Sequence, residues 1–233
     1  GLAVGAVRVV WAADGGKSVM RCLSLGAGVQ STTLALMVAA GELGPIDAAI
    51  FADTGWEPRK VYEHLEWLRP LLPFPVHVVT AGNIREGILA RRNASGGRYV
   101  AIPWYVQNSD GSAGMGRRQC TSEYKLTPIM RKLRDLLGAS RRGRIARGSV
   151  EQWIGISTDE ASRMKPALQQ WMVNRWPLVE LGMSRKDCLA WIAAKGYPTP
   201  PKSACIGCPF HNQRAWEAMM VDAPDEFAEA CQV

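Results

Sequence analysis

The chain has 233 residues, 47% of them hydrophobic, so we expect one domain with a sizeable core, or one domain with a small appendage. No apolar run reaches the roughly eighteen residues of a membrane-spanning helix, and six cysteines do not indicate a secreted disulfide scaffold, so a cytoplasmic protein is expected. The 28 lysines and arginines against 21 acids give a formal charge of +7, which favours anionic partners over cationic ones.

The first segment, residues 1–18, is small and apolar but is broken by Arg8. It lacks the basic leader of a signal peptide, and we interpret it as an N-terminal extension. A predicted strand over residues 19–25 then runs into a turn with two glycines, which is followed by the apolar run 34–37. This order predicts a strand, a phosphate-binding loop and a helix.

The predicted loop contains Gly26 and Gly28, and glycines let a backbone approach an anion closely. The helix behind the loop aims free N–H groups and the positive end of its dipole at the same point. Ser31, Thr32 and Thr33 are able to cap this helix or to donate to phosphate oxygens. The Gly-Lys-Ser/Thr of a Walker loop is missing, and an ordinary strand-to-helix turn remains the alternative.

A second buried strand, residues 50–53, ends in an acid, Asp53, followed by Thr54 and Gly55. A helix over residues 61–68 comes next. Ligands of an open parallel sheet bind at the carboxyl ends of its strands, so the phosphate loop and the carboxylate of Asp53 are expected at one edge. The alternative for Asp53 is an ordinary acid at a helix N-terminus.

In the rest of the chain, predicted strands and helices continue to alternate. The predicted elements are a strand at 76–80, helices at 84–92 and 128–137, a strand at 150–157 and a helix from a capping box of Ser184 and Asp187 to Gly196. Residues 93–115 are expected to form a lid or binding loop. The pattern predicts an α/β fold with a doubly wound, mostly parallel sheet and helices on both faces. We expect a nucleotide-binding domain at 19–180, and a helical Cys-x-x-Cys segment at 181–233 packed on it.

Four blocks of the sequence, in family order, resemble the PP-loop ATP pyrophosphatase superfamily, in its branch similar to PAPS and APS reductases. The family loop Ser-Gly-Gly-x-Asp-Ser corresponds to residues 26–31, where Gln30 replaces the Asp. This variant is associated with reductase-like proteins of phages and bacteria. Residues 51–57, 120–133 and 155–163 resemble the other three blocks. The resemblance spans roughly residues 19–211 and implies an adenine nucleotide alpha hydrolase-like fold.

The resemblance implies that ATP is cleaved between its α and β phosphates, while the loop holds pyrophosphate and a substrate oxygen attacks the α-phosphorus. The residues it places at the nucleotide are Ser24, Gly26, Ala27, Gly28, Gln30, Ser31, Thr32, Asp53 and Gly155. Asp53 would bind Mg²⁺ directly or through water. Lys125 and Arg163 would neutralise phosphate charge, with a surface ion pair as the alternative for each. Asp159 and Glu160 would orient Arg163.

Cys205 and Cys208 form a Cys-x-x-Cys turn, in which two thiolates can reach one metal. Cys120 lies 85 residues upstream of Cys205, a spacing like that in APS reductases, whose four cysteines hold a [4Fe–4S] cluster. Gln119 stands where the fourth cysteine would be, so the resemblance implies a cluster on three cysteines, with Cys120 also catalytic and one iron open to hydrosulfide. The alternatives are a Cys₃His zinc site with His211, and a redox or structural Cys-x-x-Cys.

The other cysteines are expected to have no part in a cluster. Cys22 and Cys188 fall in apolar surroundings and are predicted core residues. Cys231 lies near the last residue and does not match the catalytic Glu-Cys-Gly of PAPS reductases. Three tryptophans are also predicted to lie in the core rather than to stack on bases: Trp153, Trp171 and Trp176.

Together these features favour an ATP-dependent sulfurtransferase that forms AMP and pyrophosphate. It would adenylate an oxygen of a nucleobase or other nucleic-acid component and insert sulfur there with its iron–sulfur cluster. Two alternatives stay open: a PAPS or APS reductase-like oxidoreductase that releases sulfite, and a non-catalytic nucleotide-binding module of a DNA-modification or defence complex. The expected partners are ATP and a sulfur donor protein or sulfide, and a homodimer is left open.

Positive charge gathers between Arg131 and Arg147, where Arg141, Arg142 and Arg144 follow one another closely. One interpretation is a contact with a nucleic-acid backbone. The alternative is a solvated helix face with a flexible loop. A positive surface would also favour the anionic nucleotide of the enzyme itself.

Overall fold

The computed structural model describes residues 19–92, 102–116 and 118–233. The predicted extension 1–18 and the first part of the predicted lid, 93–101, lie outside the described residues. The elements in chain order are β1 (Met20–Leu25), α1 (Val29–Ala39), β2 (Ala48–Asp53), α2 (Arg59–Leu68), η1 (Arg69–Leu71), β3 (Val76–Thr80), α3 (Ile84–Leu89), β4 (Tyr105–Gln107), β5 (Ala113–Met115), η2 (Thr121–Leu126), α4 (Thr127–Leu136), β6 (Val150–Ile154), η3 (Thr158–Arg163), β7 (Met172–Arg175), α5 (Pro177–Glu180), α6 (Arg185–Ala194), α7 (Gln213–Asp222) and α8 (Pro224–Cys231). In the described part of the chain, no helix has both the length and the apolar character needed to cross a membrane.

Two compact units make up the chain. Unit 1 contains the described residues up to 51, together with 63–77 and 133–202. Unit 2 contains 52–62, the described residues of 78–132, and 203–233. Residues 181–202 therefore belong to unit 1 and the Cys-x-x-Cys turn to unit 2. Each unit has its own buried residues, which are described in turn.

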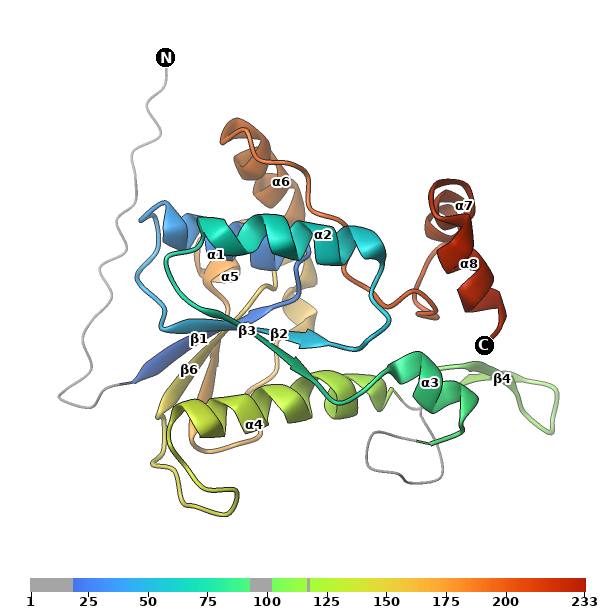
Figure 1. Cartoon of the computed structure of the whole chain (residues 1–233), viewed down its shortest axis with the longest axis horizontal. Coiled ribbons are helices and arrows are strands. Elements are labelled where there is room, and N and C mark those ends of the chain that lie inside the picture. Colours follow the sequence, from blue (N-terminus) through green and yellow to red (C-terminus); the bar gives the residue numbers. More distant parts are fainter. Residues whose placement is uncertain (1–18, 93–101, 117) are drawn as a thin grey trace. The chain divides into compact units, whose positions relative to one another are not determined.

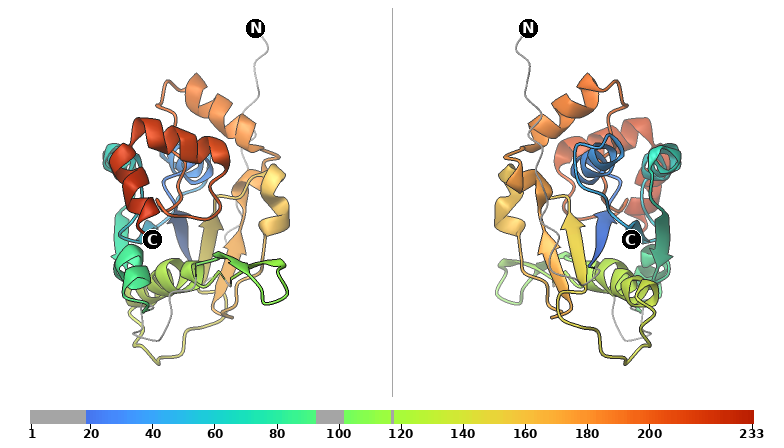
Figure 2. Two further views of the ribbon diagram at one scale, coloured as in Figure 1. Left: turned by 90° about the vertical axis from the view of Figure 1, so that its right-hand side faces the viewer. Right: turned by 90° about the vertical axis from the view of Figure 1, so that its left-hand side faces the viewer.

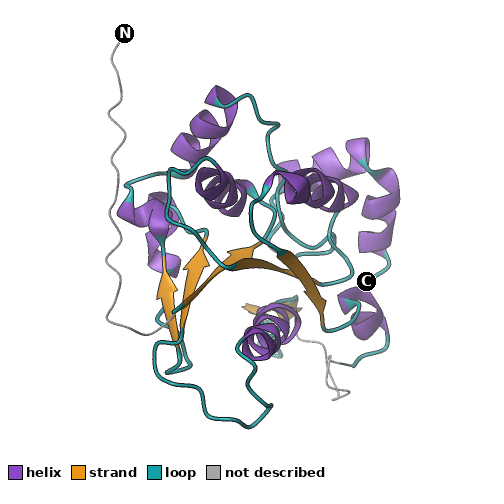
Figure 3. Cartoon of the chain, turned by 60° about the vertical axis from the view of Figure 1, so that its left-hand side comes forward, coloured by secondary structure: helices purple, strands orange, loops and turns teal. Residues whose placement is uncertain are grey.

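The main sheet has five strands in the order β3-β2-β1-β6-β7. β1 pairs in parallel with β2 on one side and with β6 on the other, and β6 pairs in parallel with β7. Figure 2 shows β1, β6 and β7 as neighbouring arrows that point the same way, and Figure 3 shows the twist of the strands. Along the chain, β2 and then β3 are added on one side of β1, and β6 and then β7 are added on its other side. Because parallel crossovers are right-handed, this reversal defines a doubly wound α/β sheet, which confirms the predicted fold class.

The core of unit 1 forms around β1, β2 and α1. Every residue of α1 from Ser31 to Val38 is buried, and the helix lies against α5 and α6 (Figure 1). The side chain of Cys22 on β1 is 1% exposed and that of Cys188 on α6 is fully buried, as predicted. Trp153 on β6 and Trp171 before β7 are also buried. A helix that is buried on all sides is typical of an element enclosed by others, and this explains the weak amphipathic pattern of α1.

Unit 2 has a separate cluster of buried side chains. Its members are Trp56, Ile84, Ile102, Tyr124, Ile206 and Met219. Cys120 and Cys205 pack against this cluster, as do Trp216 and Phe227. Gly207, inside the Cys-x-x-Cys turn, lies so close to the Trp56 ring that an added Cβ would come within 2.1 Å of it. The cysteine turn is therefore fixed to the unit by tight packing on Trp56.

Candidate functional site

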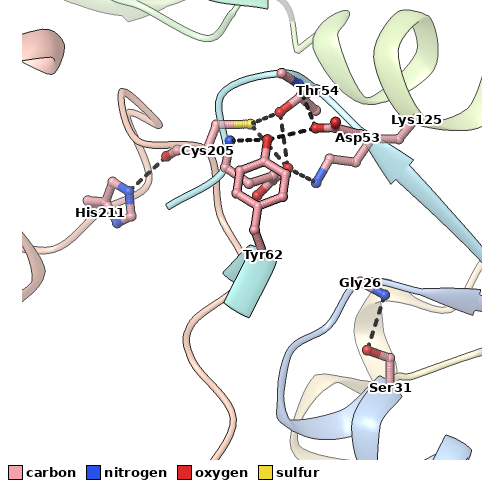
Figure 4. A network of polar contacts seen from close by, with 10 residues as sticks. Gly26, Ser31, Asp53, Thr54, Tyr62, Lys125, Cys205 and His211 are labelled. Carbon is pink, nitrogen blue, oxygen red and sulfur yellow. Dashed lines mark hydrogen bonds and ion pairs between the residues drawn. The ribbon is translucent and has the colours of Figure 1, made fainter. Parts of the chain in front are cut away.

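The loop between β1 and α1 is closed by Ser31. The hydroxyl oxygen of Ser31 accepts a hydrogen bond of 3.1 Å from the amide of Gly26, as Figure 4 shows, and its proton is directed to the carbonyl of Gly28 at 3.3 Å. Gly28 is the N-cap of α1, and no side chain caps the helix there. The serine therefore holds the loop in a tight curve while the N-terminus of α1 keeps its own donors.

The conformation of the loop is strained at Ala27. This residue has φ +54° and is completely buried. The left-handed region costs an alanine about 1 kcal/mol, and strain of this kind is found where a loop must present its backbone in one geometry. The resemblance places a glycine at this position, for which the same φ carries no such cost.

The N-terminus of α1 has the properties of an anion site. The first turn contains no acidic residue, and the first N–H groups of a helix have no partner within the helix. These groups and the helix dipole favour a negatively charged ligand. The loop therefore provides the electrostatic part of a phosphate site without any lysine.

A second segment of unit 1, after β6, packs against this loop. The side-chain amide of Gln30 donates to Glu160 at 3.1 Å and to the hydroxyl of Ser157 at 3.4 Å. A Cβ placed on Gly155 would come within 2.7 Å of the amide nitrogen of Ser31, so only glycine allows this approach. β1 and β6 are the two strands at which the order of the sheet reverses, and the crevice at such a point is where open α/β sheets bind ligands.

Arg163 is positioned by an acid of the same segment. Its guanidinium pairs with Glu160, the residue that also accepts from Gln30. Asp159, which was expected to share this task, instead accepts a hydrogen bond of 2.9 Å from the amide of Arg185. Hydrogen bonds from Ser157 and Arg185 lower the pKa of Asp159. Glu160 is thus the acid that connects the arginine to the phosphate loop.

Two other hydroxyl residues of the loop region, Thr32 and Thr33, form side-chain contacts inside unit 1. The hydroxyl of Thr32 contacts Nε2 of His64 at 3.0 Å, and that of Thr33 donates to the carbonyl of Val29 at 2.8 Å. Both threonines are completely buried. Ser24 lies within β1, between β2 and β6. In this structure the Thr32 hydroxyl is therefore directed to His64.

Asp53 ends β2 and begins a polar group in unit 2. One of its carboxylate oxygens accepts hydrogen bonds of 2.8 Å from the amide of Gly55 and from the hydroxyl of Tyr62 (Figure 4). Burial and this bond to Asp53 raise the pKa of Tyr62, so its proton stays on the phenol. Asp53 is held in one orientation by both donors, and a carboxylate is a hard ligand of the kind that Mg²⁺ takes, so its role as a magnesium ligand stays a prediction.

The centre of the polar group is Glu57, a buried acid to which the sequence analysis gave no role. Its Oε1 accepts from Lys125 at 3.0 Å and from Thr54 at 3.1 Å, and the thiol of Cys205 points to it at 3.7 Å. Its Oε2 is buried without a hydrogen-bond partner among the described residues. Burial disfavours the charged form of Lys125, but the charge and hydrogen bond of Glu57 favour it, and the pKa of Lys125 is raised. Lys125 is thus an ion-pair partner of Glu57.

The thiol of Cys205 is held in the neutral form. Burial, and then the neighbouring Glu57, raise its pKa to about 12. The Cys-x-x-Cys turn is closed by a bond of 3.0 Å from the amide of Cys208 to the carbonyl of Cys205, and the ring of His211 contacts the same carbonyl at 3.0 Å. A cluster or a zinc ion would need thiolates gathered around one point.

The three cysteines predicted as metal ligands do not form such a group. Among residues 19–92, 102–116 and 118–233, no three or more histidine, cysteine or acidic side chains are arranged to hold a metal ion. Cys205 and Cys120 contact the same buried cluster, but the thiol of Cys205 is in hydrogen-bond contact with Glu57 and Thr54. The arrangement seen here therefore does not fit the predicted [4Fe–4S] cluster or the zinc alternative, and no chemical step is derived through either.

The sequence pattern missed four residues that organise these sites. They are His64, Glu57, Tyr62 and Ser157. The one available signal was the position of Glu57 in a buried stretch, four residues after Asp53. Its partners Lys125 and Cys205 are 68 and 148 residues away along the chain, so no local pattern could have indicated them.

The comparisons with known proteins found likeness to solved structures and not to known sequences. No family model matches the sequence, and no curated protein matches it. Among solved structures, the chain is similar to phosphoadenylyl-sulfate (PAPS) reductase from Candida auris, solved as a phosphate complex. The TM-score is 0.46 at 12% sequence identity, over 80% of this chain and 76% of that one.

Proposed function

We propose that this chain is an ATP-dependent sulfurtransferase of the PP-loop type, which forms AMP and pyrophosphate. The observation that supports it best is the meeting of the loop around Gly28 with the segment after Gly155, at the reversal point of a doubly wound sheet. Such a place combines close backbone approach with the N-terminus of a helix. This is the chemistry that a polyphosphate needs, and the resemblance of the loop to a PP-loop makes ATP the proposed nucleotide.

In this proposal the backbone amides of the loop hold the β and γ phosphates. Ser31 keeps the loop curved, and the N-terminus of α1 supplies positive potential. Arg163, oriented by Glu160, adds a full positive charge. An oxygen of the acceptor attacks the α-phosphorus, the bond from that phosphorus to the β-phosphate oxygen breaks, and pyrophosphate leaves. The resemblance makes Asp53 the proposed ligand of Mg²⁺, which would neutralise phosphate charge.

The adenylated oxygen is then a good leaving group. Hydrosulfide attacks the carbon that bears it, a carbon–sulfur bond forms, and AMP departs with the oxygen. The sulfur part of the proposal rests on the resemblance alone, because the buried Cys205 thiol is held in the neutral form beside Glu57. The proposed acceptor is an oxygen of a nucleobase or another nucleic-acid component.

A product assay tests this function against its alternatives. The purified chain is incubated with ATP, sulfide and pooled RNA or DNA, and AMP and pyrophosphate are measured. Equal amounts of both products, dependent on Ser31, would support the transferase. Sulfite release from PAPS or APS would instead indicate a reductase. Nucleotide binding without either reaction would indicate a non-catalytic module.

A further inference from the structure

The segment after α4 presents arginines that pair with no acid among the described residues. Arg141, Arg142, Arg144 and Arg147 are all exposed, and none forms an ion pair within the described residues. Other exposed basic residues, such as Arg59 and Lys60, do pair with carboxylates. Four unpaired guanidinium groups within seven residues of sequence leave a concentrated positive charge facing solvent.

The turn that carries two of these arginines has a fixed shape. The amide of Gly143 donates to the carbonyl of Ser140 at 3.0 Å, which closes a β-turn with Arg141 and Arg142 at its two central positions. A Cβ on Gly143 would come within 2.9 Å of the Ser140 hydroxyl and 3.3 Å of the Ser140 amide nitrogen, so the two ends of the turn lie close together. The two central side chains are consequently directed outward from a closed turn.

Arg134, on the last turn of α4, fastens this turn to unit 1. One guanidinium nitrogen of Arg134 donates to the carbonyls of both Ser140 and Gly143, each at 2.6 Å. Arg134 is partly buried and bonds to the backbone of its own unit, whereas the four arginines after it are exposed. Arg134 therefore orders the loop that carries Arg141 and Arg142. Because the loop is already ordered, less conformational entropy is lost when a ligand binds.

We infer that this arginine turn, defined as Arg141, Arg142, Arg144 and Arg147, binds the phosphate backbone of a nucleic acid. Guanidinium groups match phosphate oxygens with two parallel hydrogen bonds, which favours arginine at such contacts. A membrane surface would also need apolar anchors, and no large exposed hydrophobic residue occurs between Leu137 and Ser149. The turn is a different surface from the phosphate loop, so the inference would stand even if the loop bound no nucleotide.

The test measures binding of the full chain to a labelled DNA duplex, its single strand and the matching RNA, from about 50 to 200 mM salt. In the test variant Arg141, Arg142 and Arg144 are changed to Gln. In the matched control three other exposed basic residues of unit 1, Lys165, Arg185 and Lys186, are changed to Gln, which removes the same charge. We expect the slope of log affinity against log salt to become shallower by about two to three in the test variant alone.

Several results would overturn the inference. These are no binding to any of the three probes, an equal loss in the control, and binding to anionic phosphatidylserine vesicles in place of nucleic acid. ATP titration of both variants separates this test from the proposed function, since neither set of residues touches the phosphate loop. Arg134→Lys tests the fixed shape, because it keeps the charge but replaces the guanidinium nitrogen that donates to both carbonyls. We expect affinity to fall several-fold, and unchanged affinity in a folded variant would refute the ordered turn as a part of recognition.

Discussion

The side-chain amide of Gln30, in the first turn of α1, donates a hydrogen bond of 3.1 Å to the carboxylate of Glu160, 130 residues further along the chain. The PP-loop pattern that this chain resembles has an aspartate in place of Gln30. An aspartate here would set one carboxylate against another, whereas the amide can donate. Gln30 can therefore donate a hydrogen bond to Glu160, the acid that also pairs with Arg163.

This pairing predicts the effect of a charge at position 30. Gln30→Glu should place like charges together and weaken ATP binding about fivefold, which corresponds to about 1 kcal/mol. Exchanging both partners, with Gln30→Glu and Glu160→Gln together, should restore part of the loss because one donor again meets one acceptor. Calorimetric titration with ATP measures both. A double variant that binds worse than either single variant would show that the pair does not act as a unit.

Gly155 should be indispensable to the loop. Gly155→Ala puts a Cβ within 2.7 Å of the Ser31 amide nitrogen and must displace the phosphate loop. We expect a loss of about 1–3 kcal/mol in unfolding free energy together with weaker ATP binding, measured by denaturant unfolding and calorimetry. Gly116→Ala is the matched control, since its Cβ would meet nothing closer than 3.4 Å. Similar losses in both variants would argue against a special role for Gly155.

The pair of Glu57 and Lys125 should be asymmetric in its energetics. The side chain of Glu57 is 2% exposed and that of Lys125 is 34% exposed. Lys125→Met leaves a buried carboxylate unpaired and should cost about 3 kcal/mol, whereas Glu57→Gln leaves an ammonium that water can reach and should cost about 1–2 kcal/mol. The double variant should lose less unfolding free energy than the sum of the losses in the two single variants. Additive losses in urea unfolding would mean that the two groups do not interact.

His64 should make unit 1 sensitive to mild acid. Burial lowers its pKa, so the unfolded chain binds a proton at a pH where the folded chain does not. Its contribution is complete above the ordinary pKa of about 6.5 and is lost as the pH falls below it. We expect the unfolding free energy of the wild type to drop between about pH 6.5 and 5, and that of His64→Gln to drop less. Parallel curves for the two proteins would contradict this role.

Much of the fold was predictable because local signals agreed with the tertiary structure. The strand at Val76–Thr80 occurs as expected, and the capping box of Ser184 and Asp187 is present at the start of α6. The alternation of strands and helices gave the doubly wound sheet. The predicted helix at 84–92 ends early, at Leu89, because Ala90 caps it and Arg91 turns to φ +52°.

Other elements carry no sequence signal strong enough to be found. The hairpin of β4 and β5 has strands of three residues, below the length at which alternation is visible. The π-helical segment η2 runs straight into α4, and no residue pattern distinguishes the two. The contacts of Glu57 in unit 2 had no local signal. Cys120, Cys205 and Cys208 were predicted as metal ligands, whereas the contact of the Cys205 thiol with the buried Glu57 joins residues 148 positions apart.

The central claim is that the loop from Gly26 to Ser31 binds the phosphates of ATP, and titration calorimetry of the full chain with ATP, pyrophosphate and AMP tests it most directly. We predict that pyrophosphate competes with ATP, that AMP binds far more weakly, and that Ser31→Ala weakens ATP about fivefold by removing the bond that closes the loop. Equal affinity for ATP and AMP, or an unchanged ATP affinity in both Ser31→Ala and Gly155→Ala, would contradict it.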